Sequence, residues 1–516
     1  MEEKVDSAME FNYMIIGFLI IYFLILLFTG LLASKNTSSI EDFFLGGRKL
    51  DSLMLSTSVS STGMSGWLAL GFAGYTYENG FQSLWIMVPS ATIGILLCYV
   101  LISKRIRLYS EQTASITIIE VIKKRFYDDN NTLTIVFSLV LSAASIIYIS
   151  AQLIAIGKLL NILLDWNYSS SILIAIIIMI FYTVLGGFTA VCWTDFIQCG
   201  LMAAGSFIAG SLAIQYAGGL GSLSQKVVET NQMFPEFAVT PFSSFDSIIL
   251  GISLFIGDGI LNWIGQPTLM VRYMAAKDIK TLSSAPLITI TIQFILFMGT
   301  FIATIYMRTQ FPEPALFPYG GDTETVLIQF FITMAHPMLT GIFVSSILAA
   351  VMSTSDSLFM MTTSVLVNDI YNYLRPRSSQ KHLIFISRLV TILLGIIAYI
   401  ISMSESSVLW SSWLGWTTLG IMGMPVIIGL YWAGATKEGA ICGLLSGFTV
   451  LILWNVFDLT EKLNIFQALP SCGIAFIVTI FTSLFTAKPP DHIAEDLKSI
   501  STPSGKKGSV EVFEVK

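Results

Sequence analysis

Charged residues are scarce in this sequence. Asp, Glu, Lys and Arg make up only 12% of the 516 residues, whereas 54% are hydrophobic. This balance nearly excludes a water-soluble multi-domain protein and is typical of a polytopic membrane protein, which contacts membrane lipid. The net charge of -6 comes with no basic patch, so we expect no nucleic-acid partner.

Cysteine and histidine are also sparse. The five cysteines form no CxxC pair, and the three histidines lie far apart. These patterns argue against a disulfide framework and against a zinc site. The sequence shows no pairing of a nucleophile with a base and no phosphate-binding loop. We therefore expect neither an enzyme nor a bound cofactor.

Long apolar runs dominate the chain instead. A bilayer core needs about 20 apolar residues per helix. Runs of suitable length occupy residues 11–33, 53–77, 81–102, 133–160, 171–185, 196–217, 248–271, 287–307, 338–365, 383–403, 408–432, 440–457 and 466–485. The first run follows a stretch without the basic region of a cleaved signal peptide, so we expect it to be retained. The sequence thus predicts an all-α polytopic membrane protein with 13 transmembrane helices.

The loops indicate an orientation. An odd number of spans places the two termini on opposite sides of the membrane. If the N-terminus is external, most of the 27 Lys and Arg lie on the cytoplasmic side. By the positive-inside rule we expect a plasma-membrane protein with an external N-terminus and a cytoplasmic C-terminus. Residues 115–126 have apolar residues at helical spacing and a basic end, which fits either a short helix on the inner membrane surface or a solvated loop. The polar segment 488–516 is expected to be disordered.

Two spans contain segments that suit a continuous helix poorly. SSTGMSGW at 60–67 has four hydroxyls and two glycines, and IGDGILNWIGQP at 256–267 has three glycines and a proline. Unwound backbone in a membrane must face a cavity, a ligand or other protein, because lipid offers no hydrogen bonds. The two segments lie five spans apart, which predicts a five-helix inverted repeat whose first helix is broken. Alternatively, the small residues only allow close helix packing.

This pattern also predicts how the chain is divided. The expected parts are residues 1–50 (N-terminal segment, accessory first helix and inner loop), 51–244 (first repeat with the following outer loop), 245–436 (second repeat), 437–487 (two accessory spans) and 488–516 (cytoplasmic tail).

Aspartates within the spans are candidate site residues. An unpaired charge near the bilayer centre costs roughly 2.5 to 3.5 kcal/mol on insertion scales. Asp195 lies near a span end, whereas Asp258 and Asp356 lie deeper, with no evident local cation. Ser353, Asp356 and Ser357 share a helix face and offer the hard oxygen ligands that an alkali cation prefers. Alternatively, the serines bond back to their own helix beside a protonated or interfacial aspartate.

Several motifs occur in an order that resembles the solute:sodium symporter family, most of all its sodium/proline symporters. They are FFLGGRKL (43–50), GMSGWLALG (63–71), LGGFTAVCWTDFIQ (185–198), GQPTLMVRYMAA (265–276) and SSILAAVMST (345–354). The resemblance implies a LeuT-like five-plus-five inverted repeat with broken first and sixth core helices. It also implies coupling of inward Na⁺ flow to uptake of a small organic solute.

The same resemblance implies two cation sites. The main Na⁺ site would use backbone oxygens of Ser61, Met64 and Ala350 and the hydroxyls of Ser353 and Thr354. A second site, for Na⁺ or H⁺, would use Asp195, Ser353, Asp356 and Ser357.

A substrate pocket is implied as well. Its aromatic residues would be Tyr148 and Trp263, joined by Trp67, with Gln266 and Pro267 close by. Arg48 would lie at the inner mouth and act in coupling or gating. Alternatively, Tyr148 and Trp263 are ordinary core aromatics.

Two positions depart from the sodium/proline symporters. Those proteins read ASDMSGW where this chain reads STGMSGW, so Gly63 replaces an aspartate, and Gly259 replaces a tryptophan one turn before Trp263. Asp258 stands where no acid is expected. We hypothesise that Asp258 takes over part of the missing charge or binds a substrate ammonium, and that Gly259 leaves room for a larger or more cationic solute than proline.

The resulting prediction is Na⁺-coupled symport of proline or a related amino acid by alternating access. Two alternatives stay open. One is Na⁺- or H⁺-coupled symport of another solute, such as a monocarboxylate, a sugar or a sialic acid. The other is a non-transporting sensor with the same fold.

Overall fold

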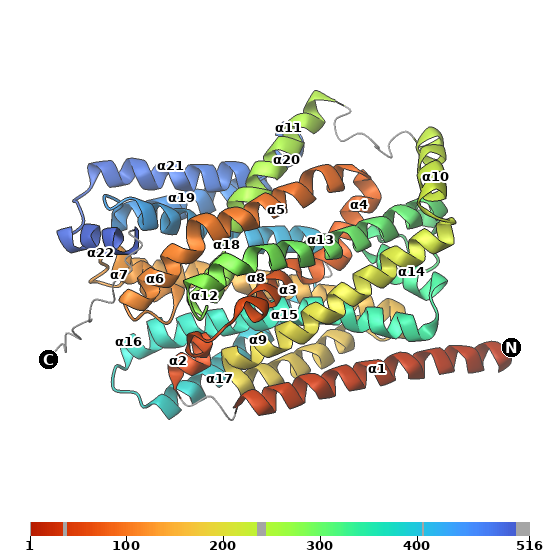
Figure 1. Cartoon of the computed structure of the whole chain (residues 1–516), viewed down its shortest axis with the longest axis horizontal. Helices are drawn as coiled ribbons and strands as arrows, with labels where there is room; N and C mark the ends of the chain where they lie inside the picture. Colours follow the sequence, from red (N-terminus) through yellow and green to blue (C-terminus); the bar gives the residue numbers. More distant parts are fainter. Residues whose placement is uncertain (1, 35–38, 235–243, 405–406, 502–516) are drawn as a thin grey trace.

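The structure, a computed structural model, describes residues 2–34, 39–234, 244–404 and 407–501. Within these ranges the chain is helical, and the one β-bridge pairs Leu50 with Ala276. Figure 1 shows the long helices lying roughly alongside one another, with α1 along one edge of the bundle and α19 and α21 along the opposite edge. The all-α prediction is confirmed.

The helices of the first half have these bounds: α1 Glu2–Ser34, α2 Ile40–Leu45, α3 Ser52–Gly66, α4 Ala73–Asn79, α5 Val88–Leu97, α6 Lys104–Gln112, α7 Ile118–Arg125, α8 Thr132–Leu164, α9 Tyr168–Ala217 and α10 Leu220–Met233. Short π-helical or 3₁₀ segments join several of them, among them η1 Gly46–Arg48, η2 Trp67–Phe72, η3 Ser83–Met87 and η4 Cys98–Ser103.

The second half continues with α11 Phe245–Ser253, η5 Leu254–Asn262, α12 Pro267–Met274, α13 Ile279–Gln310, η6 Pro314–Leu316, η7 Thr323–Thr325, α14 Val326–Met334, α15 Pro337–Ser364, η8 Val365–Tyr371, α16 Asn372–Leu374, α17 Gln380–Ser402, α18 Val408–Tyr431, α19 Lys437–Val456, α20 Leu459–Leu463, α21 Ala468–Phe485 and α22 Asp491–Ser501.

Eleven helices in the described part of the chain are long and apolar enough to cross a membrane. They match eleven of the thirteen expected spans. The other two expected spans are helical but are not among these eleven: residues 53–77 form α3, η2 and α4, and residues 171–185 belong to the first part of α9. The multi-pass membrane class therefore holds, while the count of thirteen stays a prediction.

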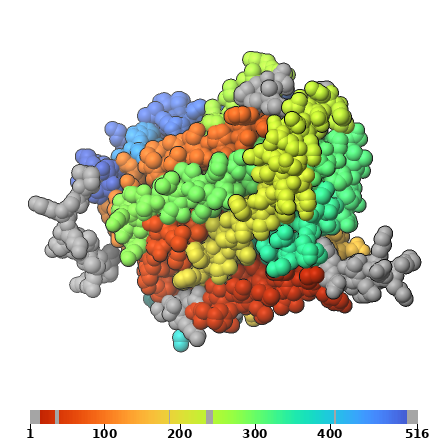
Figure 2. All heavy atoms as spheres, turned by 45° about the vertical axis from the view of Figure 1, so that its right-hand side comes forward, coloured from red at the N-terminus to blue at the C-terminus, as the bar shows by residue number. Residues whose placement is uncertain are grey.

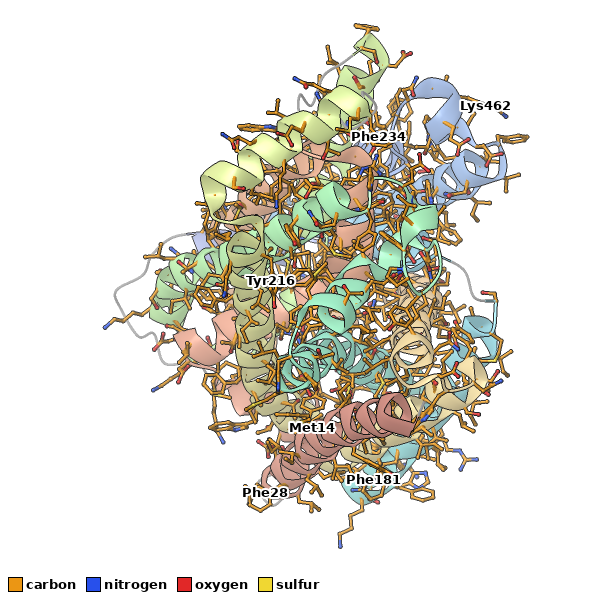
Figure 3. All side chains as sticks on the ribbon, turned by 90° about the vertical axis from the view of Figure 1, so that its right-hand side faces the viewer. Met14, Phe28, Phe181, Tyr216, Phe234 and Lys462 are labelled. Carbon is orange, nitrogen blue, oxygen red and sulfur yellow. The ribbon has the colours of Figure 1, made fainter. Side chains whose placement is uncertain are left out.

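Burial separates central from peripheral helices. In α18, 89% of the most apolar 18-residue stretch is buried, compared with 28% of the corresponding stretch in α1 and in α17. The outer helices expose large apolar side chains: Met14 and Phe28 of α1 and Phe181 of α9 extend outward in Figure 3. Figure 2 shows α1 running along the surface of the molecule. Such apolar outer surfaces suit contact with lipid.

The hydroxyl-rich helix α3 lies in the interior. Every residue from Leu55 to Gly66 is buried, and α3 packs against α9, α13 and α15. Because lipid cannot satisfy hydroxyl groups, a helix of this composition is stable in a membrane only where other protein surrounds it. This placement sets the candidate site at the centre of the bundle.

Two segments that were expected on the inner side, residues 115–126 and 488–516, differ in part from expectation. Helix α7 confirms the short helix within residues 115–126, and the Thr117 hydroxyl caps it by accepting from the Glu120 amide at 3.0 Å. The tail from residue 488 is not disordered throughout, since α22 packs its buried residues Ile493, Leu497 and Ile500 against the protein. These three share one helix face, a pattern that the polar composition concealed. Residues 502–516 lie outside the described ranges.

Candidate functional site

The first interruption lies between α3 and η2. Ser65 has φ 14° and ψ −172°, which is not helical. Side chains from α8 hold the backbone here: the Gly66 amide donates to Gln152 Oε1 at 2.8 Å, and the Tyr148 hydroxyl donates to Ser65 Oγ at 3.1 Å. Ser65 Oγ also accepts from the Trp67 amide at 3.0 Å. The freed backbone is thus satisfied by protein rather than by lipid.

The second interruption precedes α12. Gln266 is extended, with φ −72° and ψ 113°, and the next residue is Pro267, which has no amide hydrogen and commonly opens a helix. The carbonyl of Trp263 accepts from Cys98 Sγ at 3.1 Å. Gln266 Nε2 donates to the carbonyl of Trp416 at 2.9 Å, which ties this segment to α18.

A cavity lies between the two interrupted helices. Its lining residues are Gly63, Trp67, Tyr148, Asp258, Trp263, Ser412, Trp413 and Trp416. The structure therefore brings together five residues that the sequence singled out. Gln266 and Pro267 are not in the lining, although Gln266 donates to the carbonyl of the lining residue Trp416.

Three lining residues come from α18 and were not anticipated. Ser412, Trp413 and Trp416 belong to the stretch LWSSWLGW, residues 409–416. In the sequence this stretch reads only as part of the apolar span 408–432. The usable signal was the spacing of Trp413 and Trp416, three residues apart and so on neighbouring positions of one helix face.

The aromatic rings of the cavity meet edge to face. The centroid of Trp416 lies 5.4 Å from that of Trp263 and 5.9 Å from that of Tyr148. A Cβ atom added to Gly63 would lie 2.8 Å from Cη2 of Trp263. The Trp263 ring thus occupies the space that a side chain at position 63 would need.

Asp258 and Gly259 face different surroundings. Asp258 lines the cavity, and its Oδ1 accepts from Asn262 Nδ2 at 3.1 Å. Gly259 is not in the lining, and a Cβ atom there would collide with Ser90 of α5. The missing side chain at 259 therefore makes room for α5 rather than for a solute in the cavity.

Oxygen atoms gather where α3 meets α15. Ser353 Oγ donates to the carbonyls of Ser61 at 3.1 Å and Ala350 at 3.0 Å. Thr354 Oγ1 donates to the carbonyl of Thr62 at 3.0 Å. Four of the five predicted main-site residues thus lie together, and hydroxyls with carbonyls freed near a helix break are suitable Na⁺ ligands. The carbonyl of Met64 accepts from the Trp67 amide within the break.

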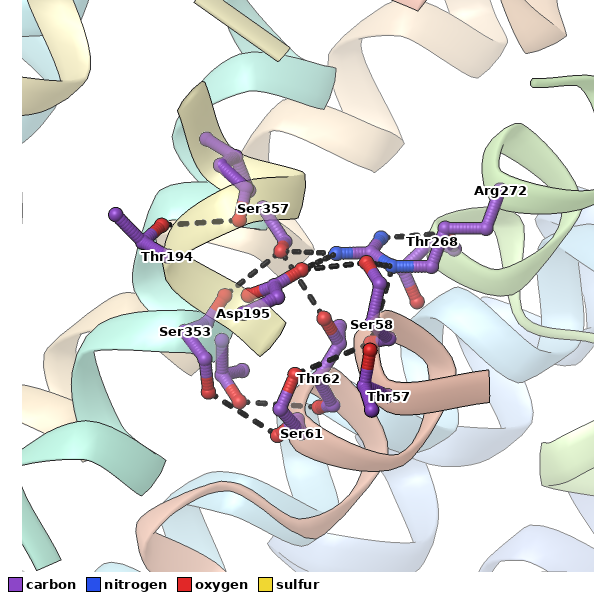
Figure 4. A network of polar contacts seen from close by, with 12 residues as sticks. Thr57, Ser58, Ser61, Thr62, Thr194, Asp195, Thr268, Arg272, Ser353 and Ser357 are labelled. Atoms are coloured by element: carbon purple, nitrogen blue, oxygen red, sulfur yellow. Dashed lines mark hydrogen bonds and ion pairs between the residues drawn. The ribbon is translucent and has the colours of Figure 1, made fainter. Parts of the chain in front are cut away.

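A buried ion pair lies beside this cluster (Figure 4). Arg272 Nη2 is 3.1 Å from Asp195 Oδ2, and the two side chains are 1% and 0% exposed. Ser58 Oγ donates to the same carboxylate oxygen at 2.5 Å and accepts from Arg272 Nε at 2.8 Å. Arg272 also donates to the Ser357 hydroxyl, which links the pair to α15.

Arg272 was not among the predicted site residues. It follows directly after the expected span 248–271, so it was not counted among the charges within the spans. Asp356, the other predicted carboxylate, accepts from Thr183 Oγ1 of α9 at 2.8 Å. Among the described residues, Asp195 Oδ1 is buried without a hydrogen-bond donor, so the pair retains one acceptor directed into the interior.

Arg48 closes one end of the bundle. Its guanidinium donates to the carbonyls of Met274 and Ser115, each at 2.8 Å, and so ties the segment before α3 to the end of α12 and to the α6–α7 loop. Backbone bonds from Leu50 to Ala275 and from Lys277 to Leu50 reinforce the closure. Burial and, to a lesser extent, the charge of Arg107 lower the pKa of Arg48 from its ordinary value.

Glu324, in η7 just before α14, joins a second set of polar contacts. Its carboxylate is 2.5 Å from Lys158 Nζ of α8. It also accepts from the Val408 and Leu409 amides at 3.0 and 2.8 Å, so it caps the first turn of α18. Polar contacts thus tie helices together around Arg48 and around Glu324.

Known proteins resemble this chain over most of its length. A profile of the sodium:solute symporter family matches residues 43–447. A high-affinity proline transporter of Bacillus subtilis is 29% identical, with 90% of this chain and 97% of that protein covered. Sodium/proline symporter 2 of Staphylococcus saprophyticus is 30% identical, with 90% and 91% covered. A solved structure of a Na⁺-coupled sialic acid symporter, in a substrate-bound outward-open state, superposes with a TM-score of 0.74 at 19% identity and covers 93% of this chain and 99% of that one.

Proposed function

Because the chain belongs to the sodium:solute symporter family, we propose that it carries proline or a closely related amino acid across the membrane together with Na⁺. The observation that carries this proposal is the adjacency of two sites at the same helix interruption. The aromatic cavity and the hydroxyl–carbonyl cluster both include residues of α3 between Ser61 and Trp67. One rearrangement of that segment would therefore affect both sites.

The proposed topology has thirteen spans arranged as two inverted five-helix repeats, residues 51–244 and 245–436, with the N-terminus outside. The interruptions at Ser65 and at Gln266 lie in the first helix of each repeat and border the same cavity, which supports this arrangement. In this orientation Arg48 lies at the cytoplasmic end and Glu324 at the external end.

The proposed main Na⁺ site uses the carbonyls of Ser61, Met64 and Ala350 and the hydroxyls of Ser353 and Thr354. These hydroxyls donate to carbonyls in the structure and can turn their lone pairs to a cation instead. The proposed second cation site uses Asp195, Ser353, Asp356 and Ser357. Arg272 compensates the charge of Asp195, so a further cation there depends on the unpartnered Oδ1 and on Asp356.

The proposed substrate site is the cavity itself. Tyr148, Trp263 and Trp67 supply ring surfaces, and Asp258 supplies a negative charge. Gln266 and Pro267 fix the second interruption, while Gly63 accommodates the Trp263 ring.

In the proposed cycle, Na⁺ binds from outside and stabilises an outward-open form in which the solute site is complete. A ligand shifts such an equilibrium only by its differential affinity for the two forms. The solute then binds and the external end closes through Glu324. Release of the Arg48 contacts opens the cytoplasmic end, where Na⁺ and the solute leave.

Uptake into proteoliposomes tests this proposal. Labelled proline, alanine, lactate, glucose and sialic acid are offered with an inward Na⁺ gradient, with an inward H⁺ gradient, and with neither. We expect concentrative uptake of proline only with the Na⁺ gradient. Uptake of lactate, glucose or sialic acid alone, uptake driven by H⁺ alone, or no uptake of any solute would overturn it.

A further inference from the structure

We propose that the cavity selects solutes by the number of N–H bonds on their cationic nitrogen, and favours N-methylated amino acids over primary ones. This inference rests on the proposed function, because it treats the cavity as the solute site. It starts from what the lining contains. Five of its eight residues are aromatic, and Asp258 is the one with a formal charge.

The aromatic residues provide a surface for a cation without N–H groups. Ring faces attract cations through the quadrupole of the π-system, most strongly for tryptophan, and such groups of rings are the recurring receptors for quaternary ammonium ions. Trp263, Trp413 and Trp416 are each less than 8% exposed. Desolvation of this degree raises the contribution of each ring.

Acceptors for N–H groups are few in the cavity. One oxygen of Asp258 already accepts from Asn262, and Ser65 Oγ already accepts from Tyr148 and Trp67. A primary ammonium has three N–H donors, a secondary ammonium has two, and a quaternary one has none. Each buried donor without an acceptor weakens binding by roughly tenfold, so every methyl group on nitrogen removes such a penalty.

The carboxylate of the solute finds donors instead. Among the described residues, Trp67 Nε1, Ser412 Oγ and Trp413 Nε1 are buried without hydrogen-bond partners, and all three belong to the lining. An indole N–H and a hydroxyl can donate to a carboxylate. The chemistry of the lining therefore suits a zwitterion, with its methylated nitrogen between Asp258 and the rings and its carboxylate at Trp67 and Ser412.

Isomeric ligands separate this effect from size. Sarcosine and alanine share one formula, as do N,N-dimethylglycine and 2-aminoisobutyrate. One methyl group in the first pair and two in the second are on nitrogen in one isomer and on carbon in the other. Calorimetric titration of the purified protein in Na⁺-containing detergent solution gives the Kd of each. We expect sarcosine to bind roughly tenfold more tightly than alanine, and N,N-dimethylglycine, which has two fewer N–H bonds than its isomer, to exceed 2-aminoisobutyrate by more than about tenfold. Affinity should also rise from glycine to glycine betaine. Equal affinities within the pairs, or tighter binding of the C-methyl isomers, overturns the proposal.

Variants locate the effect. Trp416→Leu should reduce the preference for sarcosine over alanine to less than about threefold, whereas Trp193→Leu, at an exposed tryptophan of α9 outside the lining, should leave it unchanged. An unchanged preference in Trp416→Leu contradicts the proposed site. The isomer titrations alone decide the proposal if Trp416→Leu fails to fold.

The two proposals fail in different ways. If proline uptake follows the Na⁺ gradient while the isomer pairs bind alike, the selectivity is wrong and the symport stands. If the isomers bind as expected while no solute accumulates with Na⁺, the symport is wrong and the selectivity stands.

Discussion

Two carboxylates near the centre of the bundle have contrasting surroundings. Asp195 is 0% exposed and paired with Arg272 at 3.1 Å. Asp258 lies half-buried at a cavity, where an amide of Asn262 is its hydrogen-bond donor. The pair at Asp195 is internally compensated, whereas the charge of Asp258 faces the space in which a solute would lie.

This contrast separates two uses of a negative charge in a membrane protein. A buried ion pair in a low-dielectric interior depends on both of its members, because removing one leaves the other uncompensated. A carboxylate beside a cavity can instead have its charge compensated by a bound cationic ligand, so it can contribute to the recognition of that ligand. Exchanges at the two sites should therefore change different measured properties.

The largest expected effect follows loss of Arg272. Arg272→Ala leaves Asp195 buried without its cation, and we expect a loss of about 3 to 5 kcal/mol in stability, seen as a lower thermal midpoint in detergent and little folded protein. Arg388→Ala, at an exposed arginine of α17, should change little. The double variant Arg272→Met with Asp195→Asn should recover much of the stability. No recovery in the double variant would contradict the role assigned to the pair.

The next effect concerns the cluster beside that pair. Ser353→Ala combined with Thr354→Ala removes the two hydroxyls that face the α3 carbonyls, and we expect the apparent Na⁺ affinity of uptake to fall by more than about tenfold. Ser345→Ala is the matched control, since the Ser345 hydroxyl donates to Gly341 of its own helix. Retained Na⁺ stimulation in the double variant would exclude this cluster as the main cation site.

The contrast also explains what could be predicted from the sequence. A polar residue in an apolar run is informative because its burial in the membrane costs free energy unless it has a partner. Asp195, Asp258, Ser353 and the regions of both interruptions could be predicted for this reason. Arg272 escaped it because it follows the expected span end by a single residue. Hydropathy marks the edge of a span only to within a few residues.

Apolar residues that line a site carry no such signal. Trp413 and Trp416 lie in a run that reads as an ordinary membrane helix, and only the packing of α18 against the interrupted helices directs them to the cavity. Tertiary packing likewise places Gly259 against Ser90 of α5. Comparison of motifs could not have predicted this contact. The sequence gives the type of each residue, but not whether its side chain points into the cavity or toward a neighbouring helix.

Equal exchanges at the two aspartates sharpen the comparison directly. Asp195→Asn should lower the thermal midpoint, because it leaves the Arg272 cation uncompensated. Asp258→Asn should leave the midpoint near that of the unaltered protein while the affinity for cationic solutes falls by roughly tenfold. Asp246→Asn, at an exposed position of the same span, controls for the loss of one charge. If Asp258→Asn also destabilises the protein, Asp258 is a structural residue and the contrast fails.

The smallest expected effect is at Gly63, where steric fit rather than charge is tested. In Gly63→Ala the new methyl group would lie 2.8 Å from the Trp263 ring, so the ring must shift, at an expected cost of about 1 kcal/mol in solute affinity. Gly200→Ala is the control, because nothing lies within 4 Å of a Cβ atom there. Adding Trp263→Phe to Gly63→Ala should relieve the collision. The double variant should therefore lose less solute affinity than the sum of the losses in the two single variants. Strictly additive losses would show that Gly63 and Trp263 act independently. The absence of a side chain at position 63 would then not determine where the Trp263 ring lies in the cavity.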